Sequence, residues 1–177
     1  MSLFEKFPPL EWKGKKLIWD TRQTENAQPE ILVYDTSTSP EFQNLLNARS
    51  KRHKDSELQL IPEGVSEFLK LRAISQWGAA SKKIKILAVT GTNGKSTSVA
   101  LLRYLLSQQG FSCAEVGTLG ISLFKPYAPQ AFENLDTGFT TPECHQLHYL
   151  FHQLQKKSIQ YVAMEVSSHA IELGRIQ

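Results

Sequence analysis

A glycine-rich segment that ends in a lysine and two hydroxyl residues is the part of the sequence with the clearest chemistry. Glycines let the backbone bend so that successive N–H groups face the phosphates of a nucleotide, and a helix that follows adds the positive end of its dipole. Lys95 would supply a point charge to the phosphates, and the Ser96 hydroxyl could hold Mg²⁺. The segment therefore predicts a site for a nucleoside triphosphate, formed by Gly91, Thr92, Asn93, Gly94, Lys95, Ser96 and Thr97.

This segment is a shortened form of the P-loop pattern. The full pattern, Gly-x-x-x-x-Gly-Lys-[Ser/Thr], would need glycine at position 89, where the chain has Val89. A glycine turn that merely joins a strand to a helix is the alternative interpretation. The flanking residues favour the nucleotide site, because an apolar strand-like run, 84–90, precedes the turn and a helix-forming stretch, 95–109, follows it.

Polar residues follow each of three predicted strands, 84–90, 112–116 and 159–166. In an open parallel sheet, ligands bind in the crevice outside the carboxyl ends of the strands, so these residues could share one site. Glu165 stands at the end of the third strand. A buried carboxylate is costly unless it is paired. A magnesium ion would be a suitable partner if it were held by a triphosphate and by Ser96 of the glycine-rich segment 91–97, here called the phosphate turn. We expect Glu165 to be a metal ligand; a structural carboxylate that caps the next backbone turn is the alternative.

Further polar side chains fall at predicted helix starts. Thr140 and Thr141 would lie at the N-terminus of a helix, where a threonine could cap the helix and a hydroxyl would also suit an anionic ligand. Ser167 and Ser168 could bind a polar substrate or begin a helix. His169 could act as a general base, but a histidine beside a turn is more often a hydrogen-bonded structural residue, and we favour that interpretation.

The order of predicted elements indicates an α/β protein with a small N-terminal α/β domain, followed by the first part of a P-loop-type parallel-sheet ATPase domain. The polar stretch 78–83 separates the two, which gives domains 1–80 and 81–177. In the second domain we expect helix 95–109 to direct Val99, Leu101, Leu102, Leu105 and Leu106 inward, and the stretch after Gly120 to be irregular. The first domain is expected to contain strands at 16–22, 31–34 and 58–61 and helices at 40–52 and 65–77.

Composition excludes several classes of protein. A chain of 177 residues with 41% hydrophobic and 21% charged residues is typical of a globular protein, and a net charge of +3 does not indicate a nucleic-acid partner. No run of 18 apolar residues or signal peptide is found, so we expect a cytoplasmic protein without a membrane partner. The cysteines, Cys113 and Cys144, show no metal-binding spacing and are expected to be free thiols.

Four motifs in order resemble the MurE branch of the Mur ligase family, which adds the third peptide residue to UDP-N-acetylmuramoyl-L-alanyl-D-glutamate. They are the segments 91–97, 116–120, 140–143 and 164–170, the last followed by Gly174 and Arg175. The resemblance implies that the first motif binds ATP with Lys95 as the catalytic cation, and that Ser96 and Glu165 hold Mg²⁺. It also implies that the UDP-MurNAc-dipeptide contacts Thr21, Thr140, Thr141, Ser167 and Arg175.

The implied reaction is an ATP-dependent amide ligation. The γ-phosphoryl group passes to the D-glutamyl carboxylate, and the acyl phosphate is attacked by the amine of an amino-acid substrate, whose identity these motifs do not specify. Catalysis would rest on positioning and electrostatics rather than on a protein nucleophile.

In the family, a carbamylated lysine and the whole amino-acid-binding domain lie beyond the position that corresponds to 177. The resemblance therefore implies that this chain is incomplete and that it is not an active ligase by itself. The residues are also compatible with two alternative functions. The chain could belong to another P-loop enzyme, or it could be a non-catalytic module that binds a nucleotide or UDP-sugar. The oligomeric state is not specified by the sequence.

Overall fold

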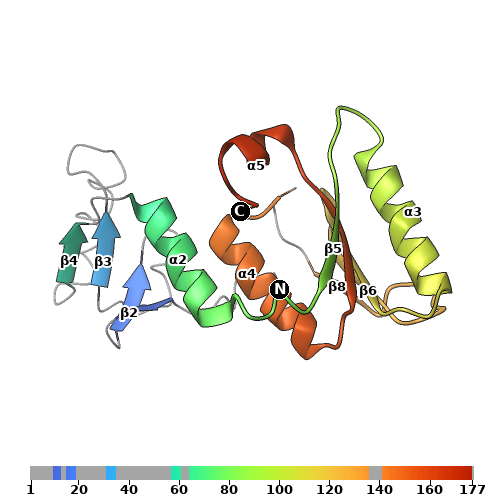
Figure 1. Ribbon diagram of the computed structural model, residues 1–177, viewed down its shortest axis with the longest axis horizontal. Coiled ribbons are helices and arrows are strands. Elements are labelled where there is room, and N and C mark those ends of the chain that lie inside the picture. The colour runs from blue at the N-terminus through green and yellow to red at the C-terminus, as the bar shows by residue number, and fades with distance from the viewer. Residues whose placement is uncertain are drawn as a thin grey trace. The chain divides into compact units, whose positions relative to one another are not determined.

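The computed structural model describes residues 10–12, 15–18, 31–34, 57–60, 64–135 and 141–176 (Figure 1). Contacts divide the chain into two compact units, and the division falls between Gln76 and Trp77. Each unit has its own sheet, and each is described separately.

The first unit contains a four-stranded sheet in the order β1-β2-β3-β4. The strands are β1 (Glu11–Trp12), β2 (Lys15–Ile18), β3 (Ile31–Tyr34) and β4 (Glu57–Leu60), and helix α2 (Val65–Trp77) follows them. Strand β1 is antiparallel to β2, whereas β2, β3 and β4 are parallel. The sequence predicts three of these strands and α2. The helix predicted at 40–52 lies outside the described residues.

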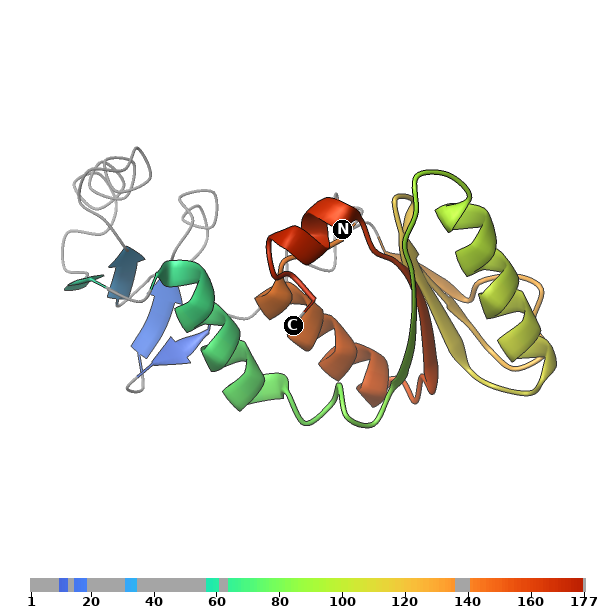
Figure 2. The same cartoon turned by 45° about the horizontal axis from the view of Figure 1, so that its top comes forward.

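The second unit is built on a five-stranded sheet in the order β5-β9-β6-β7-β8. Strands β5 (Lys85–Val89), β9 (Tyr161–Glu165) and β6 (Cys113–Gly117) are parallel, and β7 (Gly120–Phe124) and β8 (Glu133–Leu135) extend the sheet antiparallel. The sheet lies between helices α3 (Lys95–Gln108) and α4 (Cys144–Lys156), as both views show (Figures 1 and 2). A short helix, α5 (Ser168–Glu172), follows β9. The mixed α/β fold with a parallel, P-loop-type sheet is thus confirmed.

Strand β9, which pairs with a strand on each side, carries much of the core, as its continuous apolar run predicts. Val162, Ala163 and Met164 are buried between α3 and α4, and the α4 residues Leu147, Leu150, Phe151 and Leu154 are buried as the helical spacing indicates. Glu165 therefore ends a strand that is enclosed along most of its length, and this fixes the position of its backbone.

The prediction of an irregular stretch after Gly120 is wrong, because β7 and β8 lie there. A two-residue turn, Thr118 and Leu119, joins β6 to β7, and Gly117 pairs with Gly120 across it. So short a connection can only return the chain antiparallel, and Gly120, directly after the turn, has a positive φ of +97°, which glycine adopts without strain. The short apolar run of β7 did not by itself indicate a strand.

The prediction of which α3 residues face inward is also wrong in part. Val99 is buried, but Leu101 is 56% and Leu105 is 51% exposed. The helix directs Arg103 and Ser107 toward β6 and the end of β7, where Arg103 pairs with a β6 glutamate and the Ser107 hydroxyl donates to a backbone carbonyl. Since successive residues are rotated by about 100°, Leu101 and Leu105 lie on the opposite flank of the helix.

Both cysteines are free thiols, as predicted, and the structure shows that both are buried. Burial raises the pKa of Cys113 to about 11, which keeps the thiol protonated at neutral pH. None of the helices in the part of the chain that the structure describes is both long and apolar enough to span a bilayer.

The two edge strands of the five-stranded sheet, β5 and β8, differ in how well they are protected against pairing with another chain. Strand β8 is short and polar, and Lys157 Nζ lies 2.6 Å from Glu133 Oε2 at that edge. At the other edge, β5 is apolar in sequence, and Ile86 is 40% exposed. Natural proteins rarely leave an apolar edge strand open, because its unpaired backbone groups can pair with another chain.

We therefore expect the chain to self-associate at high concentration, and Ile86→Lys to weaken this association about tenfold, because an edge lysine opposes strand pairing. Sedimentation velocity over a concentration series measures the effect. Leu119→Lys is the matched control, since it adds the same charge at an exposed apolar residue in the β6–β7 turn. Equal effects of the two variants would contradict association through β5.

Candidate functional site

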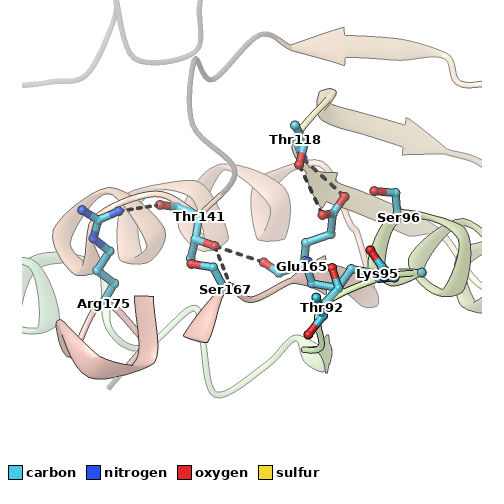
Figure 3. A pocket seen from close by; sticks show the side chains of 10 residues that line it. Thr92, Lys95, Ser96, Thr118, Thr141, Glu165, Ser167 and Arg175 are labelled. Carbon is cyan, nitrogen blue, oxygen red and sulfur yellow. Dashed lines mark hydrogen bonds between the residues drawn. The ribbon is translucent and has the colours of Figure 1, made fainter. Parts of the chain in front are cut away.

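A cavity of about 550 Å³ opens at the carboxyl ends of β5, β6 and β9 (Figure 3). Most of the residues that the sequence singled out meet in it, although they come from segments far apart in the chain. The lining consists of Thr92, Asn93, Gly94, Lys95, Ser96, Thr118, Thr141, Glu165, Ser167 and Arg175. This is the crevice that the strand order of an open parallel sheet predicts.

The phosphate turn depends on two glycines with positive φ. Gly91 has φ +144° and Gly94 has φ +79°, values that other residues adopt only with strain. Helix α3 begins directly after Gly94, and no side chain caps it. The first helical bond runs from Ser98 N to Gly94 O (2.9 Å), so the backbone N–H groups of the first turn remain for an anionic ligand.

Lys95 folds back over this turn. Its Nζ donates to the carbonyl oxygens of Gly91, at 2.8 Å, and Thr92, at 3.5 Å. The ammonium group is thereby held beside the helix N-terminus, where both positive charges would act on the same phosphates. Ser96 lines the same cavity, whereas Thr97, one residue further along α3, is exposed but does not line it.

Glu165 is 4% exposed, and its carboxylate points into the cavity (Figure 3). Its Oε1 accepts from Thr118 N at 3.4 Å, and its Oε2 accepts from Thr118 Oγ1 at 3.3 Å. The carboxylate therefore bonds to the turn after β6, and not to the turn that follows its own strand. It shares the cavity with Lys95 and Ser96, as a metal ligand beside a triphosphate would have to.

Thr141 does not cap a helix, which corrects the sequence prediction. It is 3% exposed, and its Oγ1 donates to Glu165 O at 3.3 Å and accepts from Ser167 N at 3.5 Å. The N-cap of α4 is Glu143, two residues later, whose backbone N donates to Gln146 Oε1 at 3.0 Å. This reciprocal capping box competes successfully with a threonine cap, and Thr141 instead connects the segment before α4 to the end of β9.

Ser167 and Arg175 have structural partners at the cavity wall. Ser167 is the N-cap of α5, and its Oγ accepts from Ala170 N at 3.1 Å. Arg175 Nη2 lies 2.8 Å from Glu143 Oε1, and Nη1 donates to Thr141 O at 3.4 Å. Its buried Nε has no hydrogen-bond partner among the described residues.

The histidines do not join this site. The side chain of His169 is 70% exposed, its Nδ1 lies 3.9 Å from Glu172 Oε2, and it does not line the cavity. Burial lowers the pKa of His145, in α4, to about 4, which makes it a neutral residue at pH 7. No histidine of the described part lines the cavity, so its chemistry rests on lysine, arginine, carboxylate and hydroxyl groups.

Two predicted contacts, Thr21 and Thr140, lie outside the described residues. Thr118 also lines the cavity. It follows the strand predicted at 112–116, one of the three strand ends expected to share a site, but the sequence assigned no role to this residue.

The oxygen donors of this cavity fit a hard divalent cation. Mg²⁺ is usually bound through one or two carboxylates together with phosphates and waters, and not by a cage of protein ligands. Glu165 and Ser96 provide one carboxylate and one hydroxyl. Among the described residues there is no cluster of three or more histidine, cysteine or acidic side chains that could hold a metal by itself.

Comparisons with known proteins agree with this geometry. A family described as the Mur ligase middle domain matches residues 89–177, just over half of the chain. A UDP-N-acetylmuramoyl-L-alanyl-D-glutamate--2,6-diaminopimelate ligase of Xanthomonas campestris pv. campestris (strain 8004) is 43% identical over 99 residues, which cover 56% of this chain and 19% of that protein. The ligase of the same name from Leptospira interrogans serogroup Icterohaemorrhagiae serovar copenhageni (strain Fiocruz L1-130) is 33% identical over 152 residues, 85% of this chain and 28% of its own.

A solved structure of a ligase with this name matches with a TM-score of 0.64 and 25% identity over 99% of the chain and 38% of its own length. The chain thus spans between a fifth and two fifths of these relatives. The matched region contains the phosphate turn, the acidic end of β9 and the residues that surround them, and on this evidence the chain belongs to the Mur ligase family.

Proposed function

We propose that this chain forms the ATP- and precursor-binding part of a MurE-type ligase, which adds the third amino acid to UDP-MurNAc-L-Ala-D-Glu. The observation that carries the proposal is the shared cavity. Lys95 and Ser96 of the phosphate turn, and Glu165, open onto the same space of about 550 Å³ as Thr141 and Arg175. A phosphoryl donor and a carboxylate acceptor could therefore lie side by side in it.

The residues divide into two groups with different roles. The turn at 91–97 would hold the ATP phosphates through backbone N–H groups, with Lys95 as the cation that stabilises the charge on the transferred phosphoryl group. Ser96 and Glu165 would hold Mg²⁺, which would neutralise the repulsion between the phosphates and the acceptor carboxylate. Arg175, whose side chain lines the cavity, would orient the anionic precursor together with the hydroxyls of Thr141 and Ser167.

The proposed reaction has two steps, a phosphoryl transfer and an amide-bond formation. A carboxylate oxygen of the precursor takes the γ-phosphoryl group of ATP and ADP leaves; the amino group of the incoming amino acid then displaces phosphate, loses a proton and forms the amide bond. We propose 2,6-diaminopimelate as the amino acid, since the relatives reported above are named for it. We also propose that residues 1–80 bind the uridine part, with Thr21 near it, that 81–177 bind ATP, and that the reaction takes place in the cytoplasm.

Isothermal titration of the 177-residue chain tests the proposal. We expect ATP to bind with a strong dependence on Mg²⁺, and UDP-MurNAc-L-Ala-D-Glu to bind at least tenfold more tightly than UDP-N-acetylglucosamine, which lacks the peptide. Binding of ATP without preference for the dipeptide precursor would contradict the ligase assignment and favour a nucleotide-binding module. Phosphate release with acceptors unrelated to the precursor would indicate a different P-loop enzyme.

A further inference from the structure

The turn between β6 and β7 is fixed to the carboxylate of Glu165. Thr118 donates to both of its oxygens, from the backbone N to Oε1 at 3.4 Å and from Oγ1 to Oε2 at 3.3 Å. The preceding residue, Gly117, lies so close that a Cβ atom there would collide with Oε1 and would lie 2.8 Å from Cδ. The turn is itself rigid, since it has only two residues between the paired Gly117 and Gly120.

This arrangement restricts where the carboxylate can point. An ionised carboxylate has about four acceptor positions, and Thr118 uses two of them, one on each oxygen. The backbone of Glu165 is fixed in a strand that pairs on both sides, and Gly117 packs against the Glu165 side chain. Two acceptor positions remain, and the Glu165 side chain lines the same cavity as Lys95 and Ser96 (Figure 3).

We propose that Thr118 is a positioning residue, which orients Glu165 so that its free acceptor positions face a divalent cation bound with ATP. The inference rests on the proposed function, because it takes Glu165 as the metal ligand. Residues that orient a metal ligand by hydrogen bonding typically change metal affinity by about 10- to 100-fold when they are replaced. The hydroxyl of Thr118 is the only part of this contact that a side-chain substitution can remove without moving the backbone.

Thr118→Val tests the proposal, because valine keeps the branched shape and the backbone N–H but lacks the hydroxyl. Binding of Mn²⁺ in the presence of ATP, followed by the electron paramagnetic resonance signal of free Mn²⁺, measures metal affinity without turnover. We expect Thr118→Val to weaken Mn²⁺ binding 10- to 100-fold, and Thr118→Ser, which keeps the hydroxyl, to remain within about twofold of the wild type. ATP binding without metal should be the same in all three proteins.

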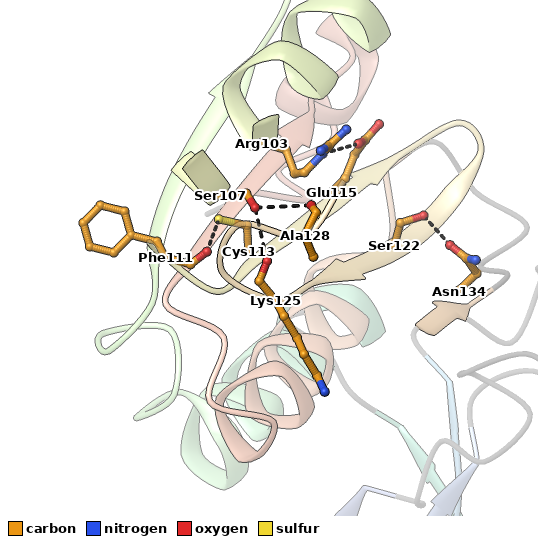
Figure 4. A network of polar contacts seen from close by, with 9 residues as sticks. All are labelled: Arg103, Ser107, Phe111, Cys113, Glu115, Ser122, Lys125, Ala128 and Asn134. Carbon is orange, nitrogen blue, oxygen red and sulfur yellow. Dashed lines mark hydrogen bonds and ion pairs between the residues drawn. The ribbon is translucent and has the colours of Figure 1, made fainter. Parts of the chain in front are cut away.

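Gly117→Ala provides a second, independent variant. It leaves the Thr118 hydroxyl in place but introduces a methyl group where the carboxylate lies, and we expect it to weaken Mn²⁺ binding at least tenfold. The control is Ser122→Ala, which removes the hydrogen bond from Ser122 Oγ to Asn134 Oδ1 (2.7 Å) in the same antiparallel part of the sheet (Figure 4). This change should leave Mn²⁺ affinity unaltered, since Ser122 does not line the cavity.

The outcomes separate this inference from the proposed function. If the wild type binds neither ATP nor Mn²⁺ with ATP, the proposed function fails. If the wild type binds both and Thr118→Val binds Mn²⁺ equally well, the proposed function stands and the positioning role is overturned. A loss of metal-free ATP binding in Thr118→Val, or an equal loss of Mn²⁺ binding in Thr118→Ser, would show a structural effect and would also overturn it.

Discussion

Glu165→Gln is expected to weaken Mg²⁺ binding in the presence of ATP by more than 100-fold. The substitution removes the one carboxylate that the described cavity offers to a cation, while the size of the side chain is kept. The loss should exceed the roughly 10- to 100-fold typical of a residue that only orients a ligand, because the charge itself is removed. Isothermal titration with ATP at a series of Mg²⁺ concentrations measures the change.

The same substitution should not destabilise the fold. An amide can still accept from Thr118 N and donate to the Thr118 hydroxyl, and it removes the cost of a buried charge. We expect the metal-free unfolding midpoint to stay the same or to rise by about 2–4 °C, which corresponds to about 1 kcal/mol in a chain of this size. A fall of several degrees would indicate that Glu165 has a structural role.

Glu115→Gln is the matched control for this variant. Glu115 is a half-buried carboxylate of the neighbouring strand β6, and its Oε2 lies 3.4 Å from Arg103 Nε (Figure 4). It does not line the cavity. The Glu115→Gln substitution makes the same change of charge in the same sheet as Glu165→Gln. Its Mg²⁺ dependence should match the wild type, and an equal loss in both variants would attribute the effect to general electrostatics of the sheet.

Lys95→Ala is expected to weaken ATP binding by about 10- to 150-fold. Hydrogen bonds that involve a charged group contribute about 1.5–3 kcal/mol, and the ammonium group would lie against the phosphates at the N-terminus of α3. In the free protein the only partners of Nζ among the described residues are the carbonyl oxygens of Gly91 and Thr92. The side chain has little packing to lose, so the free energy of unfolding should change by less than about 0.5 kcal/mol.

The control for the lysine variant is Lys83→Ala, which removes one positive charge from an exposed residue outside the cavity. Titration with ATP at fixed Mg²⁺, together with thermal unfolding, measures both properties. Unchanged ATP affinity in Lys95→Ala would remove Lys95 from the phosphate site. An equal loss in Lys83→Ala would show that net charge, rather than a specific contact, attracts the nucleotide.

Much of the second unit could be predicted because its signals are local. The apolar run before Gly91 and the capacity of glycine for positive φ specify a strand, a turn and the start of a helix within a few residues. The apolar run of β9 likewise predicts a buried strand, and Glu165 is the last residue of that strand. These features depend on neighbouring residues in the chain, which pattern and propensity describe directly.

The errors arose where distant residues compete for one position. Threonine is a residue type that often caps helices, but here the Glu143–Gln146 capping box begins the helix two residues after Thr141. The Thr141 hydroxyl instead donates to the backbone of β9. Leu101 and Leu105 have helical spacing, yet Arg103 and Ser107 find partners on β6 and beyond β7 and so determine which flank of α3 is covered. Such choices depend on partners that are far away in sequence.

The sequence by itself determined the phosphate turn, the parallel strands and the acidic end of β9, because backbone freedom and apolar periodicity are properties of short segments. Only the tertiary structure decided that Thr118 meets Glu165, since hydrogen bonds between residues 47 positions apart require the strand order β9-β6-β7 to be known. The orientation of a buried carboxylate is set by the donors around it, and those donors come together only when the sheet forms.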